Sequence, residues 1–325
     1  MRAPAAGFGQ DQQRLMTKVA WLYHNRHVRQ RDIAQRLGIS QSRVSRLLDL
    51  AVSTGIVRTV VVAPDGLNAG LEEQLEQRYG LREAHVFDVA SGSSDEHELV
   101  ESLGQLVAAR LQSQPLDAEV IGFTSWSRSL RATVAALQPL RSSTRQVVEL
   151  LGDVGPVAVQ HEAADATRQL AALTGAQPLF LRIPGVVPNV QMRETMLSYD
   201  ADARRALALL DHLDMALVGI GTCEIVEPLV AGDNFFTAEQ FAYVTRLGAV
   251  GQVNLRFIAA DGTPVPSELD ELVVGVTLEQ LHRTRRVLAV AGGPSKFLAI
   301  RAALLGGWVN ALVTDLATAE FLVQP

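Results

Sequence analysis

Residues 30–48 read QRDIAQRLGISQSRVSRLL, and this stretch predicts two helices joined by a tight turn. Gly38 ends the first helix, expected over about Gln30–Leu37, because a residue without Cβ readily takes the left-handed conformation of such a turn. Ser40 is then expected to cap the second helix through its hydroxyl oxygen. A preceding helix over residues 15–23 completes a three-helix unit. Apolar residues at helical spacing predict the inner faces of the two helices: Ile33, Ala34, Leu37, Val44, Leu47, Leu48 and Ala51.

The outward face of the second helix is polar, cationic and short-chained, which favours a helix-turn-helix that reads duplex DNA. An α-helix fits the major groove, where glutamine pairs with adenine and arginine with guanine, while short serine side chains permit close approach or bind phosphate. The candidate DNA-binding residues are Gln30, Arg31, Ser40, Gln41, Ser42, Arg43, Ser45 and Arg46. The strand-like stretch Ile56–Ala63, after Gly55, would form a wing beside them. The alternative is a plain three-helix bundle that binds no nucleic acid.

The charge distribution supports the DNA-binding interpretation. Residues 1–63 hold ten basic and three acidic residues, a net charge of +7, whereas the remaining chain carries −13 and the whole chain −6. A small basic head on a large acidic body is typical of a DNA-binding module joined to another domain. The alternative is a solvated basic helix face that needs no partner.

Composition excludes several other classes of protein. The chain has 325 residues, 48% of them hydrophobic, which is enough for a sizeable core. Its apolar runs are shorter than the roughly 20 residues of a membrane span, and residues 1–13 lack the apolar region of a secretory signal. Cys223 is the single cysteine, which excludes an intramolecular disulfide and a multi-cysteine metal site. We therefore expect a cytoplasmic protein without membrane contact, metal or cofactor.

Four segments are expected along the chain. Residues 1–13 are rich in Gly, Ala and Gln and predict a disordered lead-in, and residues 14–63 would form the helix-turn-helix domain. Pro64-Asp65-Gly66 is a turn signal that marks a domain boundary. Residues 64–80 contain an amphipathic helix, interpreted as a linker or an oligomerisation helix. Residues 81–325 are expected to form an effector domain.

After Gly80, short apolar strands alternate with helices of ten or more residues, which predicts a parallel α/β sheet with Rossmann-like layering. Strands buried on both faces of a sheet give continuous apolar runs, such as Val287–Ala291. The expected strands are His85–Val89, Glu119–Thr124, Gln146–Leu151, Pro178–Ile183, Met215–Thr222, Val250–Ala259, Arg286–Gly292 and Ala311–Thr314.

Two strand-to-helix loops, 122–127 and 292–296, predict an anion site. Glycines let backbone N–H groups approach an oxyanion, and the start of the next helix adds a partial positive charge. The contributing residues are Gly122, Thr124, Ser125, Trp126, Ser127, Gly292, Gly293 and Lys296. Lys296 is one of two lysines against 27 arginines, which favours a need for its compact ammonium group. Both loops follow strands of one open sheet, so we expect them to converge on one ligand. The alternative for each loop is an ordinary glycine turn before a helix.

Several longer stretches carry a family resemblance. In the N-terminal helix-turn-helix region the stretch is RQRDIAQRLGISQSRVSRLLDLAVSTGIV. In the body they are EVIGFTSWSRSLRATVAAL, VVELLGDVG, ALVGIGT and, most specifically, VLAVAGGPSKFLAIRAALLGGWVNALVTDLATAEFLV. In this order they resemble the SorC (SorC/DeoR) family of bacterial transcriptional regulators, from about Leu15 to Val323. The resemblance implies an effector domain folded like sugar-phosphate isomerases, a homo-oligomer, often a tetramer, and a phosphorylated sugar as inducer. With the wing expected after Gly55, the predicted architecture is a winged helix-turn-helix followed by this effector domain.

Further candidate effector-binding residues rest on the resemblance. Gly152 and Asp153 stand where the family commonly has Gly-Gly, and Asp153 would accept bonds from sugar hydroxyls or cap a turn. Arg256 matches the arginine of the family's Gly-Asp-hydrophobic-x-Gly-Arg-Phe segment. Asp261 resembles the aspartate of its Asp-x-x-Gly region.

The chain departs from the family pattern in two places where a sugar would sit. Gln252 replaces the aspartate of the Gly-Asp segment, and Asn254-Leu255 replaces the residues around its glycine. In the first loop Ser125-Trp126-Ser127 replaces the more usual Gly-Trp-Gly. The predicted effector is therefore a sugar phosphate, a polyol or an unphosphorylated compound.

These observations favour a regulator of a carbohydrate or polyol catabolic operon that binds duplex operator DNA and has no catalytic residues. One alternative is an isomerase-like enzyme, which needs a base beside the loops; the candidate acids are Glu149, Asp153, Glu224 and Asp261, and Lys296 would be the amine of a Schiff-base variant. The other is a regulator that has lost small-molecule binding. A homo-oligomer, dimer or tetramer, is expected for a regulator with or without a small-molecule effector.

Overall fold

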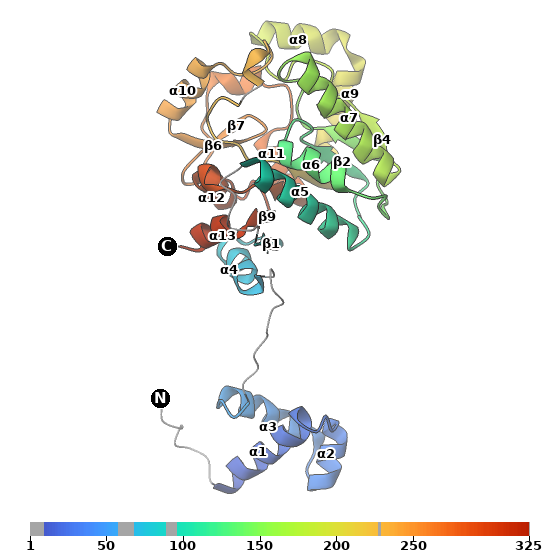
Figure 1. The fold of residues 1–325 in the computed structure, drawn as a ribbon, viewed down its shortest axis with the longest axis vertical. Coiled ribbons are helices and arrows are strands. Elements are labelled where there is room, and N and C mark those ends of the chain that lie inside the picture. Colours follow the sequence, from blue (N-terminus) through green and yellow to red (C-terminus); the bar gives the residue numbers. More distant parts are fainter. Residues whose placement is uncertain (1–9, 58–67, 89–95, 227–228, 325) are drawn as a thin grey trace. The chain divides into compact units, whose positions relative to one another are not determined.

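The structure of the protein, a computed structural model, describes residues 10–57, 68–88, 96–226 and 229–324. The chain divides into two compact units, Met1–Val62 and Ala63–Pro325, each with its own hydrophobic core (Figure 1).

Three helices form the N-terminal unit: α1 Gln10–His24, α2 Gln30–Leu37 and α3 Gln41–Ser53. All seven residues predicted for the inner faces of α2 and α3 lie in its core or pack against it, opposite Met16 and Val19 of α1. The predicted disordered lead-in is wrong for residues 10–13, which are helical. Asp11 in the first turn favours this helix start, because a carboxylate there complements the helix dipole.

The predicted turn and cap between α2 and α3 are confirmed. Gly38 lies at φ 65°, in the left-handed region. The Ser40 hydroxyl oxygen accepts a hydrogen bond from the backbone N–H of Arg43 at 3.3 Å. Ile56 and Val57 form a bend. The rest of the predicted strand Ile56–Ala63, and with it the predicted wing, lies outside the described residues.

A seven-stranded parallel sheet forms the centre of the C-terminal unit, as predicted. Its order is β1-β9-β8-β5-β2-β3-β4. The strands are β1 Glu83–Phe87, β2 Val120–Phe123, β3 Gln146–Glu149, β4 Gln177–Leu179, β5 Met215–Val218, β8 Arg286–Val290 and β9 Ala311–Asp315. From β2 the chain adds strands outward to β4, then returns to β5 on the other side of β2. This reversal between β2 and β5 is where ligands bind in open α/β sheets.

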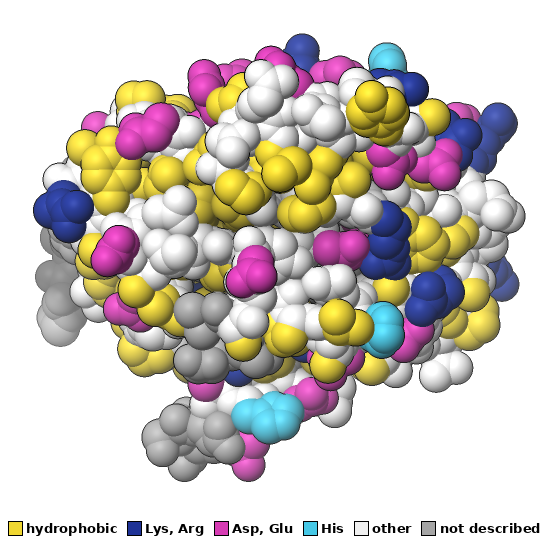
Figure 2. All heavy atoms as spheres, turned by 90° about the horizontal axis from the view of Figure 1, so that it is seen from above, with side chains coloured by type: hydrophobic (Ala, Val, Ile, Leu, Met, Phe, Trp, Pro, Cys, Tyr) yellow, Lys and Arg dark blue, Asp and Glu magenta, His cyan; other side chains and the backbone are white. Residues whose placement is uncertain are grey.

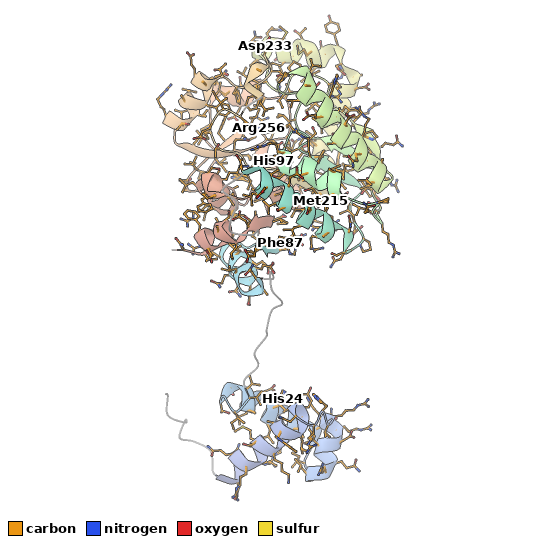
Figure 3. All side chains as sticks on the ribbon, in the orientation of Figure 1. His24, Phe87, His97, Met215, Asp233 and Arg256 are labelled. Carbon is orange, nitrogen blue, oxygen red and sulfur yellow. The ribbon has the colours of Figure 1, made fainter. Side chains whose placement is uncertain are left out.

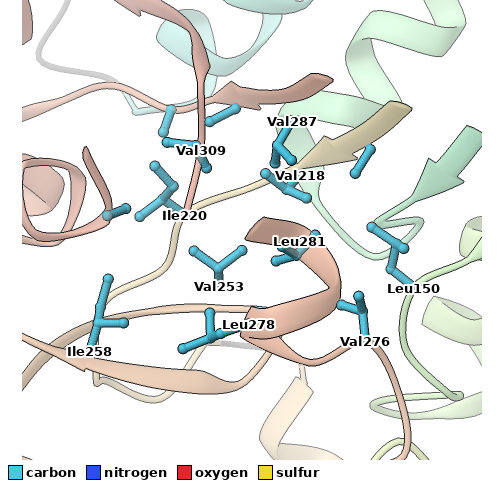
Figure 4. Packing of buried hydrophobic residues seen from close by; sticks show 14 of the residues in the cluster. Leu150, Val218, Ile220, Val253, Ile258, Val276, Leu278, Leu281, Val287 and Val309 are labelled. Atoms are coloured by element: carbon cyan, nitrogen blue, oxygen red, sulfur yellow. The ribbon is translucent and has the colours of Figure 1, made fainter. Parts of the chain in front are cut away.

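Helices cover both faces of the sheet and give a three-layer unit. Leu103 of α5, Leu130 of α6 and Leu170 of α7 pack on one face. Residues of α9, α11, α12 and α13 pack on the other, where Val218 and Val287 of the sheet meet Leu281 (Figure 4). The α-helices are α4 Ala69–Tyr79, α5 Glu96–Gln112, α6 Arg128–Ala136, α7 Val157–Thr174, α8 Val190–Tyr199, α9 Ala201–Leu209, α10 Ala238–Arg246, α11 Leu278–Arg283, α12 Phe297–Leu305 and α13 Leu316–Val323, and the 3₁₀ helices are Leu210–His212, Leu229–Ala231, Glu268–Leu272 and Pro294–Lys296.

The predicted strand Val250–Ala259 is wrong. It is an antiparallel hairpin outside the main sheet, made of β6 Ala249–Val253 and β7 Arg256–Ala259. The two residues between them, Asn254 and Leu255, have φ of 49° and 62°. Positive φ at both central positions is the geometry that two-residue hairpins favour. The turn lacked a signal in the sequence because leucine rarely adopts this conformation.

The predicted linker helix is part of the C-terminal unit. Leu75 of α4 is fully buried in the same core as the sheet. Glu72 and Glu76 accept hydrogen bonds at 2.9 Å from the backbone N–H groups of Val86 and Ala84 in β1. Because β1 is the edge strand, these carboxylates occupy donors that another strand would otherwise pair with. A role for α4 in oligomerisation stays a prediction.

Replacing Gly104 of α5 by alanine is expected to destabilise the C-terminal unit by about 1–3 kcal/mol. An added Cβ would lie 2.6 Å from the Cβ of Ala132 and 2.8 Å from its backbone carbonyl carbon in α6, so the helices would have to separate. Gly70 of α4 is the matched control, because nothing lies within 4 Å of its Cβ position. Urea unfolding followed by circular dichroism compares G104A with G70A, and equal midpoints would contradict the expectation.

Candidate nucleic-acid interface and effector site

The predicted DNA-reading face is open to solvent. Gln41, Ser42, Arg43 and Arg46 are exposed on α3 and Ser45 is half-exposed. The core is formed from the other side of the helix, by Val44, Leu47, Leu48 and Ala51. Figure 3 draws the side chains that project from the helices of this unit. Arg46 Nε donates to the carbonyl of Ser42 at 3.3 Å, so part of its guanidinium lies along the helix. On α2, Arg31 is exposed beside Asp32 at 3.7 Å, and Gln30 is half-buried at the helix start.

A second cationic surface on α1 was not predicted. Trp21 is 47% exposed, and the guanidinium of Arg26 lies 4.8 Å from its ring centroid. Together with Gln13, Arg14, Thr17 and Lys18, Trp21 lines an open groove of about 680 Å³. An exposed tryptophan among basic residues is the signal that could have indicated this surface. On the face of the C-terminal unit that Figure 2 draws, by contrast, Lys and Arg side chains lie among Asp and Glu.

The first predicted effector loop follows β2. Thr124 is buried, and its hydroxyl donates to the side-chain oxygen of Asn254 at 2.9 Å, which ties the loop to the β6–β7 hairpin. Trp126 packs edge-on against Phe235 at 6.3 Å between ring centroids. Ser127 stands at the N-cap position of α6 without a side-chain capping bond, and its hydroxyl oxygen lies 2.9 Å from where a Cβ of Gly219 would be. The loop after β5 therefore runs directly beside this loop.

The second predicted loop follows β8. Gly293 lies at φ 95°, and its N–H donates to Asp315 Oδ2 at 2.8 Å and to the Thr318 hydroxyl oxygen at 3.0 Å. Gly292 has no room for a Cβ, which would collide with Asp315. Lys296 is half-buried at the end of the loop. Burial lowers the pKa of Lys296, while the carboxylate of Glu96 acts in the opposite direction.

The β6–β7 hairpin brings the loops into one site. The backbones of Gly221, after β5, and Gln252, in β6, exchange hydrogen bonds at 3.0 and 2.9 Å. Gly251 packs on Ala299 in the first turn of α12, three residues beyond Lys296. With the Thr124–Asn254 bond, the hairpin thus contacts elements that follow β2, β5 and β8. The loop after β5 was not assigned to the site, although Gly219 and Gly221 directly after an apolar strand were a usable signal.

Two buried donors at this site have no protein acceptor. Trp126 Nε1 and Asn254 Nδ2 are inaccessible to solvent and lack a hydrogen-bond partner among the described residues. Leaving a buried donor unpaired costs about 1–3 kcal/mol, and such groups in native proteins call for an explanation. Trp126 belongs to the Thr124–Ser127 loop and Asn254 is hydrogen-bonded to it, so the site is suited to a ligand that carries oxygen acceptors.

Two predicted effector-binding residues are placed elsewhere. Arg256 is buried, and its guanidinium donates to the carbonyl oxygens of Asp270 at 2.7 Å and Val276 at 3.0 Å, so it holds the 270–276 segment. Burial lowers the pKa of Arg256. Asp261 accepts from the backbone N–H and hydroxyl of Thr263 in the turn after β7. The adjacent Gly262 packs on Gly306, at the end of α12 away from Lys296.

Three others are engaged by packing or by an ion pair. Gly122 lies within β2, where a Cβ would collide with Leu150, so the glycine serves packing. Gly152 is pressed against the backbone of residues 183–185. Asp153 accepts from Arg182 Nη1 at 2.9 Å. Burial raises the pKa of Asp153, while Arg182 acts in the opposite direction. A role for Asp153 in ligand binding stays a prediction.

Metal and membrane features give no further site. In the ranges that the structure describes, no three His, Cys, Asp or Glu side chains are grouped as a metal would need, and no helix is long and apolar enough to cross a bilayer. Cys223 is a free thiol, and burial raises its pKa to about 11.

Comparison with known proteins identifies the family. Residues 66–324 match the family described as "Putative sugar-binding domain", and residues 19–66 match the MarR family. The sorbitol operon regulator of Klebsiella pneumoniae is 31% identical over 97% of this chain and 99% of its own length. The chain belongs to the SorC family of transcriptional regulators. The crystal structure of the full-length sorbitol operon regulator SorC from the same species covers 97% of this chain and 100% of its own, with a TM-score of 0.67 and 27% identity.

Two further relatives extend the range of named functions. The deoxyribonucleoside regulator of Bacillus subtilis (strain 168) is 31% identical over 97% of this chain and 98% of its own length. The erythritol catabolism regulatory protein EryD of Brucella abortus (strain 2308) is 28% identical over 96% of this chain and 97% of its own. The predicted fold class and the prediction of a helix-turn-helix transcriptional regulator with a sugar-binding domain are confirmed.

Proposed function

We propose that this SorC-family regulator controls a carbohydrate or polyol catabolic operon, and that a phosphorylated sugar or polyol binds at the loops after β2, β5 and β8. The observation that carries the proposal is the pair of buried, unpartnered donors, Trp126 Nε1 and Asn254 Nδ2, in a loop cluster that also holds Lys296. The relatives named for sorbitol, erythritol and deoxyribonucleosides support the ligand class.

The DNA-binding half of the proposal rests on α3. Its exposed glutamine, serines and arginines present donors and acceptors to the edges of bases, and the unit's net charge of +7 attracts the phosphate backbone. The acidic C-terminal unit repels the same backbone, which restricts contact to the N-terminal unit. We further propose a cytoplasmic homo-oligomer, a dimer or tetramer, since two α3 helices would read two half-sites.

In the proposed effector site, one group of residues would bind the phosphate and another the carbon chain of the ligand. The Lys296 ammonium group, with the hydroxyls of Ser125 and Ser127, would bind phosphate. The side-chain N–H groups of Trp126 and Asn254 would bind oxygen atoms of the ligand's carbon chain, because neither has an acceptor in the part of the chain that the structure describes. A ligand that binds the DNA-competent and DNA-incompetent states unequally shifts the balance between them.

Three of the four candidate bases of the enzyme alternative are engaged in contacts of their own. Glu149 is buried, and its two carboxylate oxygens accept from the Thr167 hydroxyl and the Leu181 N–H, both at 3.0 Å. Burial raises the pKa of Glu149. Asp153 is paired with Arg182, and Asp261 lies at the far end of α12. We therefore propose a regulator without catalysis.

A thermal-shift screen tests the effector class. Hexitol, pentose and tetritol phosphates, their unphosphorylated forms and inorganic phosphate are added to the full-length protein. At a concentration of about 100 times Kd, a ligand of the folded state adds about 2.7 kcal/mol, which raises Tm by roughly 5–10 °C for a domain of this size. We expect at least one phosphorylated compound to do so and to change operator binding in a mobility-shift assay. No shift with any compound would favour a regulator that has lost small-molecule binding.

A further inference from the structure

The loop after β8 is hydrogen-bonded to the start of α13. Asp315 caps α13, because its Oδ1 accepts from the Thr318 N–H at 2.9 Å. Its Oδ2 accepts from the Thr318 hydroxyl at 2.6 Å and from Gly293 N at 2.8 Å. Thr318 and Asp315 are both buried. The proposed phosphate loop therefore cannot move at Gly293 without breaking these bonds or moving the start of α13.

The other end of α13 is bound to α4. Tyr79 Oη donates to the carbonyl of Leu322 at 2.8 Å, and Arg78 Nη1 donates to the carbonyl of Val323 at 2.8 Å. These carbonyls are in the last turn of the helix, where they lack intrahelical donors. The contact is thus a specific pair of bonds between α4 and α13, and each bond involves a group that the helix itself leaves unpaired.

A second connection runs from the same loop through α12. This helix starts directly after Lys296, and its Phe297 stacks on Phe321 of α13 with ring centroids 4.5 Å apart. Arg301 donates to the carbonyl of Phe321 at 2.9 Å, and its guanidinium lies 4.2 Å from the centroid of the Phe321 ring. The helix α12 therefore contacts the same end of α13 that is bound to α4.

The chain enters the C-terminal unit through α4. This helix begins at Ala69, so any influence of the effector site that travels along the chain to the DNA-binding unit passes through it. Glu72 and Glu76 fix α4 to β1, while Arg78 and Tyr79 fix its other end to α13. A shift of α13 must be accommodated at these last two residues.

We propose that Asp315, Thr318 and Tyr79 are positioning residues that couple the effector loop to α4, with α13 as the rigid element between them. An eight-residue helix spans about 12 Å and transmits a displacement of its start to its end. The inference rests on the proposed function, since it takes the loop after β8 as part of the ligand site. None of the three residues needs to touch the ligand.

The first test needs no ligand. Hydrogen exchange measured by mass spectrometry on the full-length protein compares Thr318→Val with wild type over residues 69–79. We expect the exchange of the α4 amides to rise about threefold or more, because valine keeps the shape but loses the bonds to Gly293 and Asp315. Thr174→Val on α7 is the matched control, because Thr174 is also buried and its hydroxyl donates to the carbonyls of Leu170 and Ala171 in its own helix. Unchanged exchange in α4 would overturn the proposal.

The second test measures coupling with the sugar phosphate that raises Tm most in the screen. Tyr79→Phe removes one hydrogen bond and keeps the ring. We expect the affinity for the sugar phosphate to stay within about twofold, and the ligand-induced change in operator affinity to fall about fivefold, as one hydrogen bond implies. Tyr199→Phe, at a tyrosine 88% exposed on α8, is the control and should change neither.

The outcomes separate this proposal from the proposed function. If no sugar phosphate binds wild type, the proposed effector class fails, while the exchange measurement on Thr318→Val still decides the link between the loop and α4. If the ligand binds and Tyr79→Phe retains the full change in operator affinity, the coupling role of Tyr79 is wrong even though the effector site stands.

Discussion

Replacing both Arg43 and Arg46 by alanine is expected to lower operator affinity by roughly 100-fold or more. Each guanidinium that contacts guanine or phosphate contributes about 1–3 kcal/mol. Both side chains are exposed on α3 and absent from the core, so the Tm of the protein should not change. Fluorescence anisotropy with labelled operator DNA at one fixed salt concentration measures the loss.

The control for this variant is another pair of exposed arginines, in the C-terminal unit. Arg168 and Arg205 each form a surface ion pair within one helix, with Asp165 and Asp202. Their replacement by alanine removes the same charge without touching α3, and operator affinity should stay near wild type. Retention of full binding by R43A/R46A would show that α3 does not read the operator.

Replacing Lys296 by methionine is expected to weaken binding of a phosphorylated effector by about 10- to 100-fold. A charge-assisted bond to phosphate contributes about 1.5–3 kcal/mol, and methionine retains the apolar stem that packs at the loop. Isothermal titration calorimetry measures the loss, and operator binding without effector should stay intact. An unphosphorylated ligand should lose much less affinity.

Lys18→Met is the matched control, because Lys18 is the other lysine of the chain and lies in the N-terminal unit. Since burial lowers the pKa of Lys296, its positive charge is lost at a lower pH than that of an ordinary lysine. Effector affinity in wild type should therefore fall as pH rises through this lowered pKa, and K296M should lack that dependence. An unchanged affinity in K296M would remove Lys296 from the site.

Local signals predicted the N-terminal unit well. The left-handed Gly38 and the capping Ser40 act within a few residues of their own position, so the order of residues alone determines the turn. The continuous burial of β5 and of Val287–Val290 in β8 likewise follows from their apolar runs. Interactions of this range need no knowledge of the tertiary fold.

The direction of side chains in the effector site could not be predicted. Arg256 matches a family motif, yet its guanidinium bonds to carbonyls about 14–20 residues further along the chain, which no local pattern indicates. The bond between Thr124 and Asn254 joins residues 130 positions apart. The unpaired donors of Trp126 and Asn254 depend on the same long-range packing. Sequence reasoning found the two loops but misjudged which neighbours face them.

The carboxylates of Glu72 and Glu76 determine where the protein can be divided for study. A fragment starting at residue 81, the boundary that the sequence favours, would leave the β1 donors of Ala84 and Val86 bare and open to cross-β association between molecules. A fragment starting at Asn68 keeps them satisfied by the protein's own helix. Because these carboxylates occupy the outward donors of β1, copies of the intact body would not pair through this edge of the sheet.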